Sequence, residues 1–207
     1  MTPSGVAHAW RAMVAAVHED HAMMGHYDAK YPSRERGAPS LARDFVTRVG
    51  LQILVAYRAM RFCVEARVPL APRVVARLIR HVYGSDIHWE ASFAPGVVIV
   101  HGMGLAVARG VQVERGVILF HNVTLGLGSD PETRAVGAPV LEANVHVGPG
   151  TSIVGPVRIG ARSKITGNCF VRASVADDSL VEAPRPTVSS RVPRERHRPA
   201  AVGGPAT

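Results

Sequence analysis

Residues 86–125 read DIHWEASFAPGVVIVHGMGLAVARGVQVERGVILFHNVTL, with a bulky apolar residue at every sixth position. The same spacing returns after a polar interruption and continues to residue 171. A period of six matches neither the 3.6 residues of a helical turn nor the alternation within one strand. It is typical of a hexapeptide-repeat solenoid. The in-register positions are Ile87, Phe93, Ile99, Leu105, Val111, Val117, Val123, Leu141, Val147, Ile153, Ile159, Ile165 and Val171.

This pattern predicts a triangular prism, in which three short strands form one coil of about 18 residues and the repeated apolar side chains point inward. A single coil cannot bury its apolar side alone, so stability comes from stacked neighbours. The predicted fold class is therefore mainly β with α: a parallel β-helix, built as a hexapeptide-repeat solenoid and preceded by an N-terminal helical domain.

The repeat divides the chain into three expected parts. Residues 1–85 form the helical domain, with helices expected over 6–24, over 41–66 with Ser40 as N-cap, and through 74–82. Residues 86–176 form the β-helix. A loop at 126–139, rich in Gly and Pro, is expected to be extruded from it, although one irregular coil of the same length is the alternative. Residues 177–207 form a tail rich in Pro and Arg that we expect to be flexible.

Composition restricts the class of protein. The formal net charge is +8, but no basic stripe interleaved with aromatic residues indicates a nucleic-acid partner. An anionic cofactor such as a coenzyme A phosphate, or a simply solvated surface, explains the charge equally well. We expect no membrane span and no secretory signal. The two cysteines, Cys63 and Cys169, are expected to be reduced thiols of a cytoplasmic protein.

The candidate catalytic residues are His101 and Asp86. His101 lies in the glycine-flanked stretch 100–104, VHGMG, and Asp86 precedes it by fifteen residues, nearly one coil. We therefore expect the two residues to lie on adjacent edges of the prism. A carboxylate bonded to one ring nitrogen fixes the histidine tautomer and leaves the other nitrogen as a general base.

Three segments of the repeat resemble the serine O-acetyltransferase family of hexapeptide acyltransferases: Asp86-Ile87-His88, the glycine-flanked stretch with His101, and residues 121–126, HNVTLG. Ala56-Tyr57-Arg58 is similar to the helical domain of that family. The resemblance implies a left-handed parallel β-helix, acetyl-CoA as acyl donor and no metal. It also implies homotrimers with active sites between subunits, and trimers that sometimes pair through the helical domains.

Carried over by position, His101 matches the catalytic base of that family and Asp86 matches its partner. Backbone amides would hold the coenzyme A arm, and the anionic end would lie near a lysine. The matching positions are Gly126, Leu127, Pro149, Gly167 and Lys164, although turn geometry explains both glycines and solvation explains the lysine equally well.

The acceptor site departs from the family pattern. Val100 stands where the family has an acidic residue that helps hold the acceptor amino group. The family loop carries an Arg-His pair for the acceptor carboxylate, whereas residues 134–139 read RAVGAP, with Arg134 displaced and no histidine. Since a carboxylate taken out of water needs a cation or donors, these losses argue against free L-serine as a good acceptor.

Five further residues lie near the expected site, and the sequence gives none of them a catalytic role. His88 is expected at a surface or interface, His121 as structural or facing a subunit cleft, and Trp89 as an oligomer contact or acceptor-site wall. Asp28 and Glu35 lie in a region that supplies an acceptor contact in the family, but the sequence does not choose between them.

The leading hypothesis is an acetyl-CoA-dependent O-acetyltransferase that uses His101 to deprotonate a hydroxyl of a serine-like, modified or carrier-tethered acceptor, or of a sugar. The alternatives are an ordinary serine O-acetyltransferase of cysteine biosynthesis and a non-catalytic binding scaffold.

Overall fold

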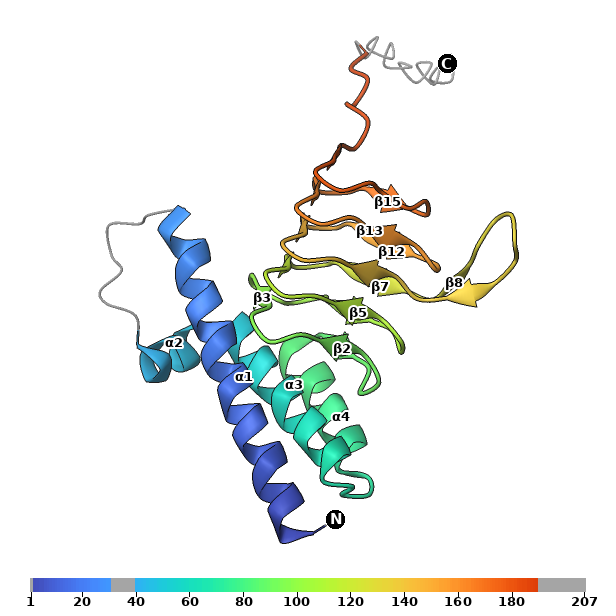
Figure 1. The fold of residues 1–207 in the computed structure, drawn as a ribbon. Helices are drawn as coiled ribbons and strands as arrows, with labels where there is room; N and C mark the ends of the chain where they lie inside the picture. Colours follow the sequence, from blue (N-terminus) through green and yellow to red (C-terminus); the bar gives the residue numbers. More distant parts are fainter. Residues whose placement is uncertain (1, 31–39, 190–207) are drawn as a thin grey trace, which may run out of the picture.

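The computed structural model describes residues 2–30 and 40–189. A helical part precedes a prism of stacked coils, whose three sides are parallel sheets around one axis (Figure 1). The helices are α1 (Pro3–Lys30), α2 (Leu41–Thr47), α3 (Val49–Glu65) and α4 (Ala71–Tyr83). None of the helices formed by these described residues is both long and apolar enough to cross a bilayer.

The prediction of one helix over 41–66 is wrong at one point. Arg48 leaves the helical conformation, with φ −119° and ψ 106°, and divides the segment into α2 and α3. Its guanidinium pairs with Asp28 of α1 at 2.5 Å and with Asp44 of α2 at 3.4 Å. These ion pairs hold the break against α1. Ser40 is the N-cap residue of α2 as expected, but it makes no side-chain cap hydrogen bond.

Successive strands of the repeat pass from one sheet to the next, so three strands complete one coil. Sheet A contains β1 (Asp86–Ile87), β4 (Ala106–Val107), β7 (Thr124–Gly126), β12 (Ser152–Val154) and β15 (Phe170–Val171). Sheet B contains β2 (Ser92–Phe93), β5 (Gln112–Val113), β10 (Val140–Leu141) and β13 (Arg158–Ile159). Sheet C contains β3 (Val98–Ile99), β6 (Ile118–Leu119), β11 (His146–Val147), β14 (Lys164–Ile165) and β16 (Leu180–Val181).

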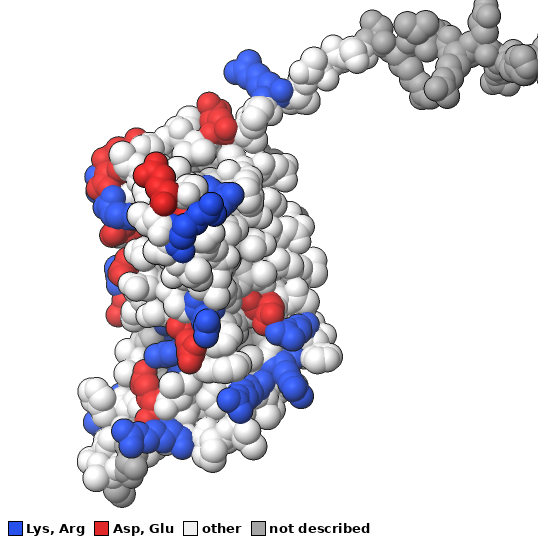
Figure 2. Space-filling model, turned by 90° about the vertical axis from the view of Figure 1, so that its right-hand side faces the viewer, with Lys and Arg blue, Asp and Glu red and all other residues white. Residues whose placement is uncertain are grey.

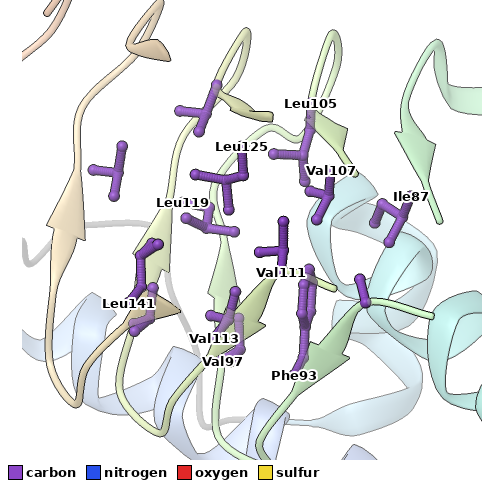
Figure 3. Close-up of a cluster of buried hydrophobic side chains, with 14 of the residues drawn as sticks. Ile87, Phe93, Val97, Leu105, Val107, Val111, Val113, Leu119, Leu125 and Leu141 are labelled. Carbon is purple, nitrogen blue, oxygen red and sulfur yellow. The ribbon is translucent and has the colours of Figure 1, made fainter. Parts of the chain in front are cut away.

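The core lies on the axis between the three sheets. All thirteen in-register apolar residues named above are buried, as the repeat predicts. Figure 3 shows side chains from the different sheets converging, including Ile87, Phe93 and Leu119. Fully burying each side chain of this size contributes about 1.5–3 kcal/mol, so the stack of coils stabilises itself.

The prediction of about 18 residues for each coil is wrong for coils that contain the turn between β3 and β4. Ile99 stacks on Leu119 and Ile87 on Val107, in both cases 20 residues apart rather than 18. Two extra residues therefore enter the turn at 101–104. From there to residue 123, the apolar residue at every sixth position is the one that immediately precedes each strand. Its side chain also faces the core.

The segment at 126–139 projects from the prism as a hairpin (Figure 1). Its strands β8 (Gly128–Ser129) and β9 (Val136–Gly137) pair antiparallel. Leu141 stacks on Val113, 28 residues earlier, so Leu141 does not follow Val123 by one coil. The ten residues beyond a regular coil of about 18 are accommodated in the projection.

A buried polar cluster joins the helices to the first coil. The Arg58 guanidinium donates two 2.9 Å hydrogen bonds to the Asp20 carboxylate, and it also donates to the carbonyl oxygens of Phe93 and Ala94. The Tyr57 hydroxyl donates to the carbonyl oxygen of Ala91. The helical residues that suggested the family resemblance therefore fix α3 on β2.

Candidate functional site

The turns between sheets C and A lie above one another and form an edge of the prism, which we call the histidine edge (residues 101–104, 121–122, 149–150 and 167–168). Backbone hydrogen bonds join each turn to the next, from the N–H of Asn122 to Met103 O, of Gly150 to His121 O, and of Asn168 to Pro149 O, at 2.8–3.2 Å. The edge therefore aligns His101, His121, Pro149 and Gly167 parallel to the prism axis.

His101 occupies the irregular turn at the start of this edge. Its φ is +65°, a value uncommon for a residue with a side chain, and Gly102 and Gly104 follow at +75° and +71°. A Cβ on Gly102 would lie 2.6 Å from Cδ1 of Ile53 in α3. The two extra residues thus turn the imidazole outward, while the glycine allows α3 to pack beneath it.

His121 stands directly above His101 on the same edge. The two rings are 5.8 Å apart and nearly perpendicular, at 68°. Nδ1 of His121 is buried, and the structure gives it no hydrogen-bond partner within residues 2–30 and 40–189. A buried, unpaired ring nitrogen is costly unless something binds it. The sequence left His121 as either structural or facing a subunit cleft; its signal was its place in the HNVTLG segment, about one coil after His101.

A first hollow of about 420 Å³, which we call the arginine hollow, lies on the sheet A side of the edge. Arg73, Arg77 and Arg80 of α4 line it together with Asp86 and Trp89. Asp86 accepts a 2.6 Å hydrogen bond from Arg80. That bond, together with the charge of Asp86, raises the pKa of Arg80. These arginines carried no sequence signal beyond their helical spacing.

A second hollow of about 860 Å³ lies on the sheet C side, between α1, α2 and β3. His101, Val100 and Phe120 line it from the prism, and Asp28 and Arg48 line it from the helices. Of the two acidic candidates, Asp28 therefore reaches the hollow of His101. Glu35 lies outside the described residues.

Asp86 and His101 are not joined within the single chain. No hydrogen bond connects their side chains in the described part, and each lines a different hollow. The cause is the insertion in the turn: Ala106 pairs with Asp86, so His101 lies five residues before the position stacked on that carboxylate. The Asp86–His101 pair expected from their spacing stays a prediction.

The predicted cofactor residues fall in three places. Pro149 and Gly167 share the histidine edge with His101. Gly126 ends β7 in the arginine hollow, and Leu127 follows it at the base of the hairpin, 39% exposed. Lys164 begins β14 on sheet C and is exposed. The first four thus border the outer face of sheet A, whereas Lys164 lies across the edge.

The remaining candidates are also placed. Trp89 is half-buried, stacked on His88 at 4.0 Å, with the Arg73 guanidinium 5.6 Å from its ring centroid. Arg134 is exposed near the hairpin tip, where its N–H donates to Asp130 O. Across residues 2–30 and 40–189, no group of three or more His, Cys, Asp or Glu side chains could hold a metal ion.

No protein-family model matches the chain. Curated relatives do: the serine acetyltransferase of Synechococcus elongatus is 32% identical over 133 residues, which are 64% of this chain and 53% of the relative. Serine acetyltransferase 2 of Arabidopsis thaliana is 32% identical over 178 residues, or 86% of this chain and 54% of the relative. The Helicobacter pylori enzyme is 28% identical over 63% of this chain and 75% of its own length. The chain thus spans about half the length of the first two.

Solved structures agree on the fold. A truncated serine acetyltransferase apoenzyme superposes with a TM-score of 0.73 at 19% identity, covering 85% of this chain and 71% of that one. Serine acetyltransferase isoform 3 of Entamoeba histolytica, in complex with cysteine, gives 0.71 at 21% identity, with 92% and 64% covered. A serine acetyltransferase in complex with CoA gives 0.70 at 21% identity, with 85% and 70% covered.

Proposed function

We propose, on the premise that this chain is a relative of the serine acetyltransferases, that it transfers an acetyl group from acetyl-CoA to the hydroxyl of a serine-like or modified acceptor. The observation that carries the proposal is the position of His101, exposed on an edge with a hollow on either side. With the same relatives in view, we propose that the β-helix is left-handed.

His101 acts as general base in this proposal. A ring nitrogen takes the proton of the acceptor hydroxyl as that oxygen attacks the thioester carbonyl of acetyl-CoA. The tetrahedral intermediate collapses by breaking the carbon–sulfur bond, and the imidazolium returns the proton to the leaving thiolate. The products are the O-acetyl ester and free CoA, so no covalent acyl-enzyme and no metal is required.

The donor lies along the outer face of sheet A. We assign the pantetheine arm to the backbone near Gly126, Leu127, Pro149 and Gly167, four positions that border this face. Lys164 serves the anionic end of coenzyme A across the edge. The solved serine acetyltransferase in complex with CoA, which is similar in fold, supports CoA as the donor class.

We propose a homotrimer with its active sites between protomers. Within one chain Asp86 and His101 line separate hollows. In such a ring each active site would lie beside the histidine edge, between two prisms, with Asp86 as the partner of His101. Pairing of two trimers through the helical domains would give a hexamer.

The acceptor is expected to differ from free L-serine. Val100 presents an apolar side chain to the hollow of His101, and Arg134 lies near the tip of a hairpin. Neither supplies the charge that an amino acid needs there. Ordinary serine acetylation remains the second candidate, because the matching relatives carry that name.

We place the protein in the cytoplasm, because Cys63 and Cys169 are both free thiols and a reducing compartment keeps thiols free.

Release of free CoA from acetyl-CoA, measured with a thiol reagent against a panel of hydroxyl acceptors, tests the proposal. Acceptor-dependent release in the wild type, lost in the His101→Ala variant, supports it. Full turnover by that variant would remove His101 as the base. Tight CoA binding without transfer to any acceptor would instead favour a non-catalytic scaffold, and efficient acetylation of L-serine would establish the second candidate.

A further inference from the structure

The basic side chains of α4 form a row along the arginine hollow. Arg73, Arg77 and Arg80 are spaced by four and three residues, which places them on one face of the helix. Figure 2 shows basic side chains gathered on the lower, helical part of the face that it presents. Of the residues that line the hollow, Asp86 alone carries a negative charge. The hollow therefore holds an excess of positive charge.

The three guanidinium groups are unequally satisfied. Arg80 is paired with Asp86 at 2.6 Å, and Arg73 lies over the Trp89 ring. Arg77 makes no ion pair or side-chain hydrogen bond in the described part of the chain. Because like charges on one face of a helix repel, an anion shared by the row would reduce that repulsion.

We infer that this row binds an anionic group, a phosphate or a carboxylate, carried by the acetyl acceptor. The inference rests on the proposed acetyl transfer and adds the class of acceptor to it. Small and apolar residues of sheet A, Ala106, Ala108 and Leu125, complete the wall of the hollow. The site therefore suits a ligand with a short uncharged body and an anionic head.

The strand order argues that the row serves the acceptor rather than coenzyme A. α4 packs against β1, the first strand of sheet A, and β4, β7, β12 and β15 follow in that order. Of the proposed pantetheine positions, Gly126 lines the hollow itself, whereas Pro149 and Gly167 precede β12 and β15 and lie further from α4, by about 4.8 Å for each strand. In the proposed arrangement the anionic end of coenzyme A lies near Lys164, which begins β14 and does not line the hollow, so the arginines are left for the other substrate.

The row also replaces charge that is missing elsewhere. The hairpin offers no Arg-His pair, and Val100 has no charge, whereas the row supplies three cations beside Asp86. An anion held by Arg77 and Arg80 would compete with Asp86 for the Arg80 guanidinium, and would thereby place the acceptor next to the carboxylate proposed to orient His101.

A binding experiment tests the anion site without any turnover. The chain has two tryptophans, so the full-length Trp10→Phe protein leaves Trp89 as its sole indole reporter. Inorganic phosphate and acetate are titrated at constant ionic strength. We expect a saturable change in Trp89 fluorescence with at least one anion, and a midpoint raised at least tenfold by Arg77→Gln and by Arg73→Gln. Arg109→Gln, an exposed arginine outside the hollow, should keep the midpoint.

A response to phosphate alone indicates a phosphate as the group that binds, and a response to acetate alone indicates a carboxylate; the turnover experiment below assigns that group to the acceptor. No saturable response, or arginine variants with the wild-type midpoint and wild-type circular dichroism, would overturn the inference. Because this arm needs no catalysis, it succeeds or fails independently of the proposed function.

A turnover experiment then connects the site to catalysis. Matched acceptors that differ only in an anionic group, such as glycerol and glycerol 3-phosphate, are compared in the thiol-release assay. We expect Arg77→Gln to raise KM for the anionic member at least tenfold and to leave kcat within threefold. Efficient turnover of an uncharged acceptor or of free L-serine, with KM and kcat unchanged in the arginine variants, would overturn the inference. The proposed acetyl transfer would still stand.

Discussion

His101 and His121 lie one above the other on a single edge of the prism, with ring centroids 5.8 Å apart and planes inclined by 68°. The pair arises because consecutive coils stack turn on turn, and because two extra residues widen the first of these turns. His101 is thereby turned outward, while His121 is partly buried beside it. The exposed ring is placed to act on a substrate, and the partly buried ring packs against it.

Replacing His101 with alanine should lower kcat about 10²–10⁴-fold, the usual contribution of a general base. Binding of CoA should persist, since the proposed cofactor contacts do not include the His101 side chain. His8→Ala, an exposed histidine in α1, is the matched control and should keep full activity. Thiol-release kinetics and calorimetry of CoA binding separate the two effects, and loss of CoA binding in His101→Ala would contradict the assignment.

Replacing His121 should have a smaller effect of a different kind. The His121→Ala change removes a ring that packs against His101, so we expect kcat to fall about tenfold while the melting temperature changes little. The discriminating measurement is kcat from thiol release, compared with the melting temperature of the same variant. A lower melting temperature with an unchanged kcat would mean that the ring serves packing alone.

The turn that carries His101 depends on its glycine. Gly102 has φ +75°, and a Cβ there would meet Cδ1 of Ile53 at 2.6 Å. We expect Gly102→Ala to destabilise the fold by about 1–3 kcal/mol and to lower activity by moving the imidazole. Gly25→Ala in α1, where nothing lies within 4 Å, should be neutral or slightly stabilising. Denaturant titration of both variants is the measurement.

The six-residue period predicted the burial of the core because each inward side chain repeats with the coil. It did not predict the shift of register at His101. The residue before each strand and the second residue of the strand both face inward, so an insertion of two residues leaves the six-residue spacing of apolar residues unchanged. The helix break at Arg48 was not predicted, because the residues on both sides favour a helix. The ion pairs that hold the break join Arg48 to α1 and α2 and are tertiary contacts. The arginine row was missed because helical arginines are usually solvated.

The joint between α1, α3 and the first coil should be sensitive to loss of one carboxylate. Asp20 is fully buried and holds Arg58 through two hydrogen bonds. Burial raises the pKa of Asp20 although Arg58 opposes the shift. Removing one partner of a buried ion pair typically costs about 3–5 kcal/mol, because the other charge stays buried.

We therefore expect Asp20→Ala to lower the free energy of unfolding by about that amount. Glu19→Ala, the neighbouring residue with an exposed ion pair to Arg115, should change it by less than about 1 kcal/mol. Equal effects of the two substitutions in urea titrations would contradict the role given to Asp20.

Stability at acid pH should depend on Asp44 of α2. Burial alone would raise the pKa of this carboxyl, but a hydrogen bond from His21 of α1 and the charges of Arg48 and Arg43 hold it below the ordinary value of 3.8. Since the folded chain binds this proton less readily than the unfolded chain, the stabilisation is complete above the ordinary pKa and is lost as pH falls toward the lowered one.

Asp44→Asn should therefore lower the free energy of unfolding by about 1–3 kcal/mol near neutral pH, where the charged hydrogen bond is lost. Between about pH 5 and pH 3 the wild type should lose stability more steeply than the variant, so that the two curves converge. Glu114→Gln, at an exposed carboxyl, should keep the wild-type profile. Urea titrations at several pH values measure the difference. Curves that stay parallel down to pH 3 would show that Asp44 does not carry this dependence.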